Sequence, residues 1–168
     1  QKVNSDLVNK YANIASRTAK FVNKYYEDTL GTELDSPELI EEFQKASINI
    51  SESYENLEFG KALREIMSLA DKANQYVDSK EPWVLIKEEG NEAVVLSICT
   101  TALNLFRILT IMLTPVVPGF TKIAQEFLNE DEISWHSIGS PLLNKKIKIF
   151  KPIITRIDET HINNLLGN

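Results

Sequence analysis

Residues 59–87 read FGKALREIMSLADKANQYVDSKEPWVLIK, and this stretch predicts a long helix that is followed at once by a second one. Its apolar residues recur three and four positions apart, which places them on one buried face of a helix: Phe59, Ala62, Leu63, Ile66, Leu69, Ala70, Ala73, Tyr76 and Val77. The polar run 78–81 interrupts this pattern, so we expect the helix to stop there. Pro82 disfavours a helical Glu81 and suits the first position of a new helix.

Trp83 therefore falls in the first turn of the second helix. A tryptophan at that point either fills the corner between the two helices or projects its ring as a stacking platform. The stretch alone favours the corner-filling interpretation, and both stay open at this point.

Length and composition set the limits of the fold and of its partners. With 168 residues, of which 43% are apolar, the chain has the size of a single domain over residues 1–168. A net charge of −6 argues against a surface coated for nucleic acid, so an anion site must be local. One cysteine, Cys99, and two distant histidines, His136 and His161, form no disulfide and no credible zinc set, which fits a reducing compartment. The chain begins with Gln1 and has no leader pattern, so we expect a piece of a longer protein.

The first helix is predicted from an N-cap at Ser5 to about Tyr26, with two distinct faces. Its apolar stripe is Leu7, Tyr11, Ile14, Ala15, Thr18, Val22 and Tyr25, and its polar stripe is Lys10, Asn13, Arg17, Lys20 and Lys24. Residues 1–26 hold five cations and one acid, a net of +4, while the rest of the chain carries −10. Composition alone favours a solvated face for this polar stripe.

The remaining segments complete an all-α, antiparallel helical bundle with a short irregular C-terminal tail. Gly31 is predicted to cap the first helix, and Ser36 and Pro37 to start the next one, whose apolar seam is Leu39, Phe43, Ala46, Ile50, Tyr54 and Leu57. Residues 94–113 are long and apolar enough for a membrane span, but a polar stripe that includes Arg107 indicates a central bundle helix and no membrane. A shorter helix, a loop with Trp135, an extended cationic segment over residues 142–157 and a last short helix over residues 157–166 follow.

The chain shows no pattern of a catalytic site, a cofactor site or a metal site. All six glycines are isolated, so no glycine-rich loop is available for phosphates or a dinucleotide. No serine or cysteine lies in a nucleophile motif, and the acidic pairs look like solvated faces. From the residues alone, the chain is a helical bundle with a binding role.

Several stretches resemble the C-terminal anticodon-binding domain of methionyl-tRNA synthetase, a class I aminoacyl-tRNA synthetase. In chain order they are Asn13-Ile14-Ala15-Ser16-Arg17, Glu58-Phe59-Gly60-Lys61-Ala62, Arg64-Glu65-Ile66-Met67, Ala73-Asn74-Gln75-Tyr76-Val77-Asp78, Pro82-Trp83, Asn104-Leu105-Phe106-Arg107, Leu113-Thr114-Pro115 with Pro118, and Lys151-Pro152 with Arg156-Ile157-Asp158. The resemblance spans nearly the whole chain. It departs from the family at Ile153-Ile154-Thr155, where the family tends to have an aromatic residue and a proline.

The resemblance implies that Asn13, Arg17 and Trp83 face the CAU anticodon of methionine tRNAs, with Trp83 stacking on an unpaired base and the other two reading base edges. Lys10, Lys20 and Lys24 would add sequence-blind attraction for the RNA backbone. The implied partners are tRNA and the catalytic domain of the same chain, in the cytoplasm. ATP, with zinc as a further candidate, is implied as a cofactor of that catalytic part of the ligase and not of this segment.

Two alternatives to this function stay open. The anticodon-binding domain of another class I synthetase would keep the fold but not the combination of Asn13, Arg17 and Trp83. A helical protein-interaction module would show no preference for any tRNA, and a buried Trp83 would favour it.

Overall fold

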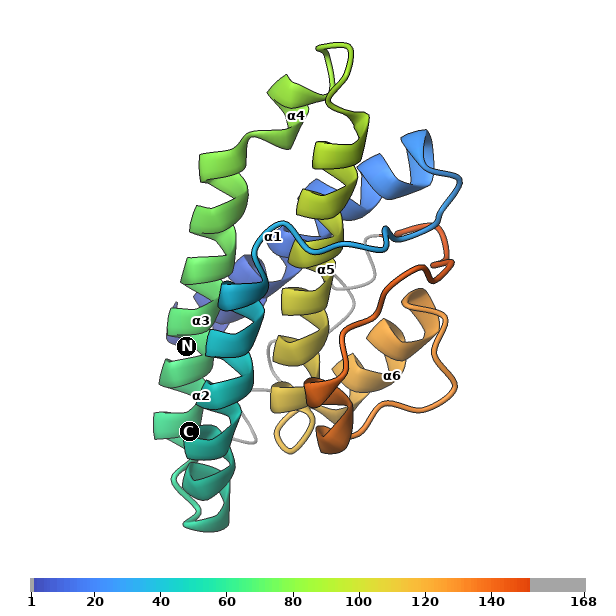
Figure 1. Ribbon diagram of the computed structural model, residues 1–168. Helices are drawn as coiled ribbons and strands as arrows, with labels where there is room; N and C mark the ends of the chain where they lie inside the picture. The colour runs from blue at the N-terminus through green and yellow to red at the C-terminus, as the bar shows by residue number, and fades with distance from the viewer. Residues whose placement is uncertain (1, 152–168) are drawn as a thin grey trace.

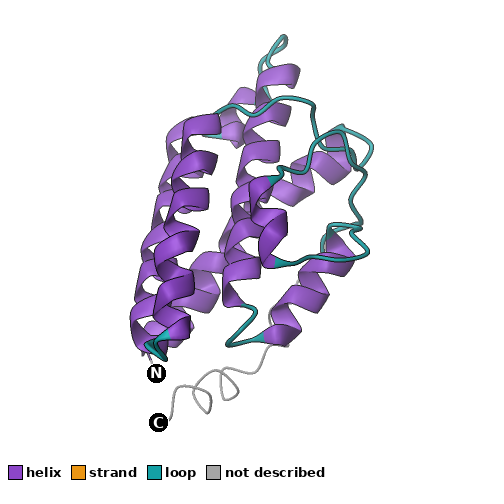
Figure 2. Ribbon diagram, turned by 60° about the horizontal axis from the view of Figure 1, so that its bottom comes forward, coloured by secondary structure: helices purple, strands orange, loops and turns teal. Residues whose placement is uncertain are grey.

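The computed structural model describes residues 2–151, which are helical apart from their connections and a C-terminal extended segment (Figures 1 and 2). The described residues contain no β-strand, only one isolated bridge between Thr29 and Lys146. In chain order the elements are α1 (Lys2–Tyr25), α2 (Pro37–Glu55), α3 (Phe59–Lys80), α4 (Pro82–Leu85), α5 (Glu92–Leu113), α6 (Pro118–Phe127) and the 3-10 helix η1 (Trp135–Gly139). The predicted all-α helical bundle is confirmed.

Helix α5 is the centre of the bundle. It packs against α1, α2, α3 and α6, and every residue from Ile98 to Leu113 is buried. In Figure 1, α2 and α3 lie side by side, α6 lies on the other side of α5, and α1 crosses behind. By length and composition α5 could cross a membrane, but 83% of its most apolar window is buried inside this fold. The prediction of a central bundle helix over residues 94–113 is therefore confirmed.

The polar stripe of α5 anchors the loops that cross it. Arg107, 5% exposed, binds both carboxylate oxygens of Glu130 and donates through Nη1 to the backbone oxygens of Ser137 (3.0 Å) and Ser140 (2.9 Å). Asn104 is also buried and bonds to the chain at residue 142 as both donor and acceptor. These buried polar groups are paired, as burial requires, and the stripe therefore stabilises the fold.

The first connection differs from its prediction at Gly31. The left-handed backbone after α1 belongs to Glu27 (φ 51°) and Asp28 (φ 60°), so Gly31 is not the helix cap. Gly31 instead lies against α5, where its N–H donates to Thr100 Oγ1 at 2.9 Å and an added Cβ would be 3.0 Å from Leu96 Cγ. The glycine permits a close approach of the chain to the side chains of Leu96 and Thr100 on α5 and does not provide a special turn.

Other differences concern the ends of helices. Ser5 lies inside α1 and is not its N-cap, since residues 2–4 contain no helix breaker and extend the helix. Residues 78–80 continue α3, because the break comes only at Glu81, which has a left-handed φ of 47° and directly precedes Pro82. Three residues predicted on apolar faces are exposed, because they lie at ends of helices or beyond them: Tyr25 (48%), Leu57 (74%) and Phe59 (36%). Ser36 and Pro37 start α2 as predicted.

The extended segment after η1 returns to the end of α1. Asn23 Nδ2 donates to the backbone oxygen of Lys148 at 3.2 Å, and Asn23 Oδ1 accepts from the N–H of Phe150 at 3.0 Å. The predicted last helix over residues 157–166 and the departure at residues 153–155 lie outside the described residues.

Candidate functional site

Asn13 and Arg17 lie one turn apart on the face of α1 that runs beside α3. Their spacing of four puts both side chains on one side of the helix, while the opposite face, with Tyr11, Ile14 and Ala15, is buried in the core. Asn13 is exposed, and the side chain of Arg17 is 23% exposed. The packing of α1 on α3 leaves both residues accessible along the line where the two helices meet, which we call the rim.

Trp83 is held at the same rim by the corner between α3 and α4. The left-handed Glu81 ends α3, Pro82 is buried at the first position of α4, and Trp83 follows it with 36% of its surface exposed. A ring that filled the corner would be buried. Val77 and Pro82 are buried on the two sides of Glu81, whereas the indole remains open to solvent on part of its surface.

The guanidinium of Arg17 lies over the Trp83 ring, with Cζ 5.6 Å from the ring centroid. Its Nη1 forms an ion pair with Asp78 Oδ1, and its Nη2 donates to the backbone oxygen of Asn74 at 3.1 Å. Arg17 Nε is buried and has no partner in the described part of the chain. The arginine is therefore held on two sides by α3 and on a third by the indole, which orients its planar fork.

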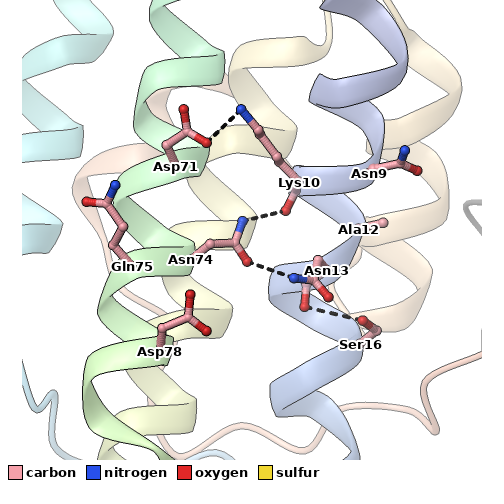
Figure 3. A pocket seen from close by; sticks show the side chains of 9 residues that line it. All are labelled: Asn9, Lys10, Ala12, Asn13, Ser16, Asp71, Asn74, Gln75 and Asp78. Carbon is pink, nitrogen blue, oxygen red and sulfur yellow. Dashed lines mark hydrogen bonds and ion pairs between the residues drawn. The ribbon is translucent and has the colours of Figure 1, made fainter. Parts of the chain in front are cut away.

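Asn13 is tied to the same helix, as Figure 3 shows. Its Nδ2 donates to Asn74 Oδ1 at 3.2 Å, and Asn74 Nδ2 in turn donates to the backbone oxygen of Lys10 at 2.9 Å. One turn before Asn13 on α1, Lys10 pairs with Asp71 at 2.8 Å. These residues line an open groove of about 640 Å³ between α1 and α3, which also includes Asp78.

The predicted site residues thus come together, and α3 contributes two that the sequence analysis did not select. Asn74 and Asp78 both contact Arg17. Both belong to the stretch 73–78, on which the family resemblance partly rests. That resemblance was the signal in the sequence that could have pointed to them as site residues. The polar stripe of α1 is also less free than a solvated face, because Lys10 and Arg17 are paired with acids of α3.

Two kinds of reactive site, a candidate metal centre and an activated cysteine, are absent from the described residues. No three His, Cys, Asp or Glu side chains of the described residues are grouped as metal ligands. Burial raises the pKa of the Cys99 thiol to about 12, which keeps it protonated and unreactive. The groups at the rim are an indole, a guanidinium and amides, which suit recognition and not catalysis.

The fold and this site together define a class of protein: a helical-bundle binding domain whose exposed rim offers one aromatic face and fixed hydrogen-bonding groups. Such a rim suits a ligand with flat faces and polar edges, as unpaired nucleic-acid bases have. Residues 29–148 match the family described as the anticodon binding domain of methionyl tRNA ligase. The chain belongs to this family.

Individual relatives agree with the family. The chain is 47% identical over all 168 residues to the methionine–tRNA ligase of Psychrobacter sp. (strain PRwf-1), of which it spans 24%. Among solved structures it is similar to the apo form of Mycobacterium tuberculosis methionyl-tRNA synthetase, with a TM-score of 0.83, 19% identity, and coverage of 94% of this chain and 34% of that one. The same enzyme in complex with methionyl-adenylate gives a TM-score of 0.80 at 20% identity, covering 89% of this chain and 31% of that one. At these identities the solved structures show the fold alone.

Proposed function

We propose that this chain recognises the CAU anticodon of methionine tRNAs as the tRNA-reading part of a methionine–tRNA ligase. The observation that supports the proposal is the position of Asn13, Arg17 and Trp83 on one accessible rim, with the guanidinium of Arg17 over the indole. In this proposal an unpaired base stacks on the exposed surface of Trp83. Asn13 and Arg17 bind the edges of the anticodon bases.

The chemistry of the three side chains fits single-stranded RNA. Loop bases are recognised by stacking on aromatic rings and by hydrogen bonds to their exposed edges. An amide offers a donor and an acceptor, and a guanidinium offers a planar set of donors. Lys20 and Lys24 continue the face of α1 beyond Arg17, are exposed, and would attract the RNA backbone without reading its sequence.

The activity of the ligase belongs in this proposal to a catalytic part of a longer chain. The segment described here spans about a quarter of its relative. The activation of methionine with ATP, and any zinc site, would belong to the rest of that longer chain. We expect the whole ligase to act in the cytoplasm.

A binding experiment with two RNA hairpins tests the proposal. One hairpin carries CAU in its loop, and the other is identical except that the three anticodon bases are exchanged. We expect the chain to bind the CAU hairpin more tightly, and Arg17→Ala to reduce this preference by about 1 to 3 kcal/mol, a range taken from base-edge readout in DNA. Lys20→Ala, one turn away on the same face, is the matched control and should weaken both hairpins alike.

Three results would contradict parts of the proposal. Equal affinity for the two hairpins would exclude CAU recognition and favour a protein-interaction module. Preference for a different anticodon would indicate the domain of another class I synthetase. If Arg17→Ala weakened the binding of both hairpins equally, Arg17 would contact only phosphate.

A further inference from the structure

We propose that Asn74 is a positioning residue that fixes the orientation of both Asn13 and Arg17 and thereby determines which base edges they accept. The inference rests on the proposed function, because it concerns how the two side chains are prepared for the anticodon. Asn74 lies on α3 between them, on the floor of the groove shown in Figure 3.

The amide of Asn74 can adopt only one orientation in this place. Its Nδ2 donates to two backbone carbonyl oxygens, of Lys10 on α1 at 2.9 Å and of Ala70 on α3 at 3.0 Å. A carbonyl oxygen cannot donate, so the reversed amide would place its own oxygen against both acceptors. The backbone of two helices therefore directs Asn74 Oδ1 towards the site.

This orientation is passed on to Asn13. Asn74 Oδ1 can only accept, so Asn13 must turn its Nδ2 to it, and the two atoms are 3.2 Å apart. Asn13 Oδ1 then points away from Asn74, and no donor in the described part of the chain bonds to it. An asparagine free to rotate would present a donor as readily as an acceptor. Held by Asn74, Asn13 presents an acceptor, which suits an amino group or a ring N–H of a base.

Asn74 also holds Arg17, through its backbone oxygen and, at a longer distance, through its side chain. Arg17 Nη2 donates to the backbone oxygen of Asn74 at 3.1 Å and lies 3.4 Å from its Oδ1. With Nη1 on Asp78, these contacts fix the plane of the guanidinium above the Trp83 ring. Asn74 thus contacts both side chains that are proposed to bind base edges, although it need not touch the RNA itself.

The test compares Asn74→Ala with Gln75→Ala in the two-hairpin experiment. Gln75 is the adjacent amide of α3 and also borders the groove, but its side chain extends away from α1 in Figure 3. We expect Asn74→Ala to reduce the preference for the CAU hairpin about tenfold or more, with unchanged affinity for the exchanged hairpin. Gln75→Ala should leave both affinities as they are. If Asn74→Ala fails to fold, Asn74→Leu, which keeps the branched shape of the side chain and favours the helix, gives the same comparison.

A double variant tests the route through Asn13. In an Asn13→Ala background, Asn74→Ala should lower the preference for CAU less than it does in the parent chain, because part of its effect passes through Asn13. Additive losses would overturn this route. If Asn74→Ala lowered the affinity for both hairpins equally, or if it retained the preference for CAU, only the positioning role of Asn74 would be overturned. A parent chain without any preference for CAU would overturn the proposed function and, with it, this role of Asn74.

Discussion

Replacing Trp83 by alanine should weaken binding of the CAU hairpin strongly. If the indole is a platform for an anticodon base, its removal costs about 1 to 3 kcal/mol of binding, which is about a five- to more than a hundredfold loss of affinity. Trp83→Phe keeps an aromatic face and should retain most of the affinity. The arginine above the ring makes the expected loss larger rather than smaller, because Arg17 would lose the surface on which its guanidinium lies.

The same substitution should cost a moderate amount of stability. A fully buried large aromatic residue costs about 3 to 5 kcal/mol when it is truncated to alanine. Trp83 is 36% exposed and lies at the end of the bundle in the short helix α4, so we expect about 2 kcal/mol. A domain of ordinary stability, about 5 to 15 kcal/mol, remains folded after such a loss. Binding can therefore be measured on the folded variant.

Tryptophan fluorescence gives a direct assay, because the chain has two tryptophans. Trp135 begins η1, which lies at the end of α5 opposite α4 (Figure 1), and its ring is edge-on to Tyr54 with ring centroids 6.4 Å apart. The CAU hairpin should quench the emission of Trp83, and this quenching should persist in Trp135→Phe and disappear in Trp83→Ala. The melting temperature of each variant, recorded by circular dichroism, shows whether the variant is folded at the temperature of the binding experiment.

A single outcome would refute the platform interpretation. If Trp83→Ala is folded and binds the CAU hairpin as tightly as the parent chain does, no base stacks on the indole. A large fall in melting temperature with unchanged affinity would instead mean that Trp83 acts in packing. The site assignment would then lose its aromatic member.

Three further predictions concern the rest of the molecule. Arg107→Leu leaves the carboxylate of Glu130 without its partner and should cost about 3 to 5 kcal/mol in urea unfolding, while the double variant with Glu130→Leu should be clearly more stable than the single one. Burial raises the pKa of Tyr11 and that of Cys99 above their unfolded values of 10.0 and 9.0, so the folded state keeps both groups protonated at a pH where the unfolded state loses their protons. The free energy of unfolding should therefore fall as the pH rises above about 9, by up to about 1.4 kcal/mol per pH unit for each group. The fall should be less steep in Tyr11→Phe. The pure chain should not catalyse methionine-dependent exchange of pyrophosphate into ATP, and any such exchange above background would contradict the absence of a phosphate-binding loop.

The sequence predicted the helices and most of their buried faces because both depend on spacing along the chain. The apolar face of α3 from Ala62 to Val77 is buried as its periodicity predicts. The errors are at ends of helices, where spacing stops being informative. An apolar residue such as Leu57 meets no partner beyond the end of α2, and Gly31 is required by a contact with α5 that no local pattern reveals.

The site could be predicted only in part, and largely through the family resemblance. Asn13 and Arg17 share a face by spacing, but nothing local tells a solvated stripe from a recognition surface. Trp83 joins them because the α3–α4 corner returns the chain to α1, which is a property of packing. The contacts of Asn74 and Asp78 with Arg17 depend on the register of α1 against α3. A single sequence does not specify that register.

Under the proposed function, the pairing of charges at the rim would explain how an acidic chain selects one anticodon instead of binding any RNA. Asp78 already neutralises Arg17, and Asp71 neutralises Lys10, so a phosphate group gains little by approaching either cation. A ligand must therefore offer more than negative charge. A base edge that matches the fixed donors and the acceptor of Asn13, together with a ring that stacks on Trp83, supplies hydrogen bonds and dispersion that a phosphate cannot supply. With a net charge of −6 over the whole chain, general attraction for RNA is weak as well. In this proposal, selectivity follows from the geometry that α3 imposes on α1, so the acids and amides of α3 should matter as much as the cations that they hold.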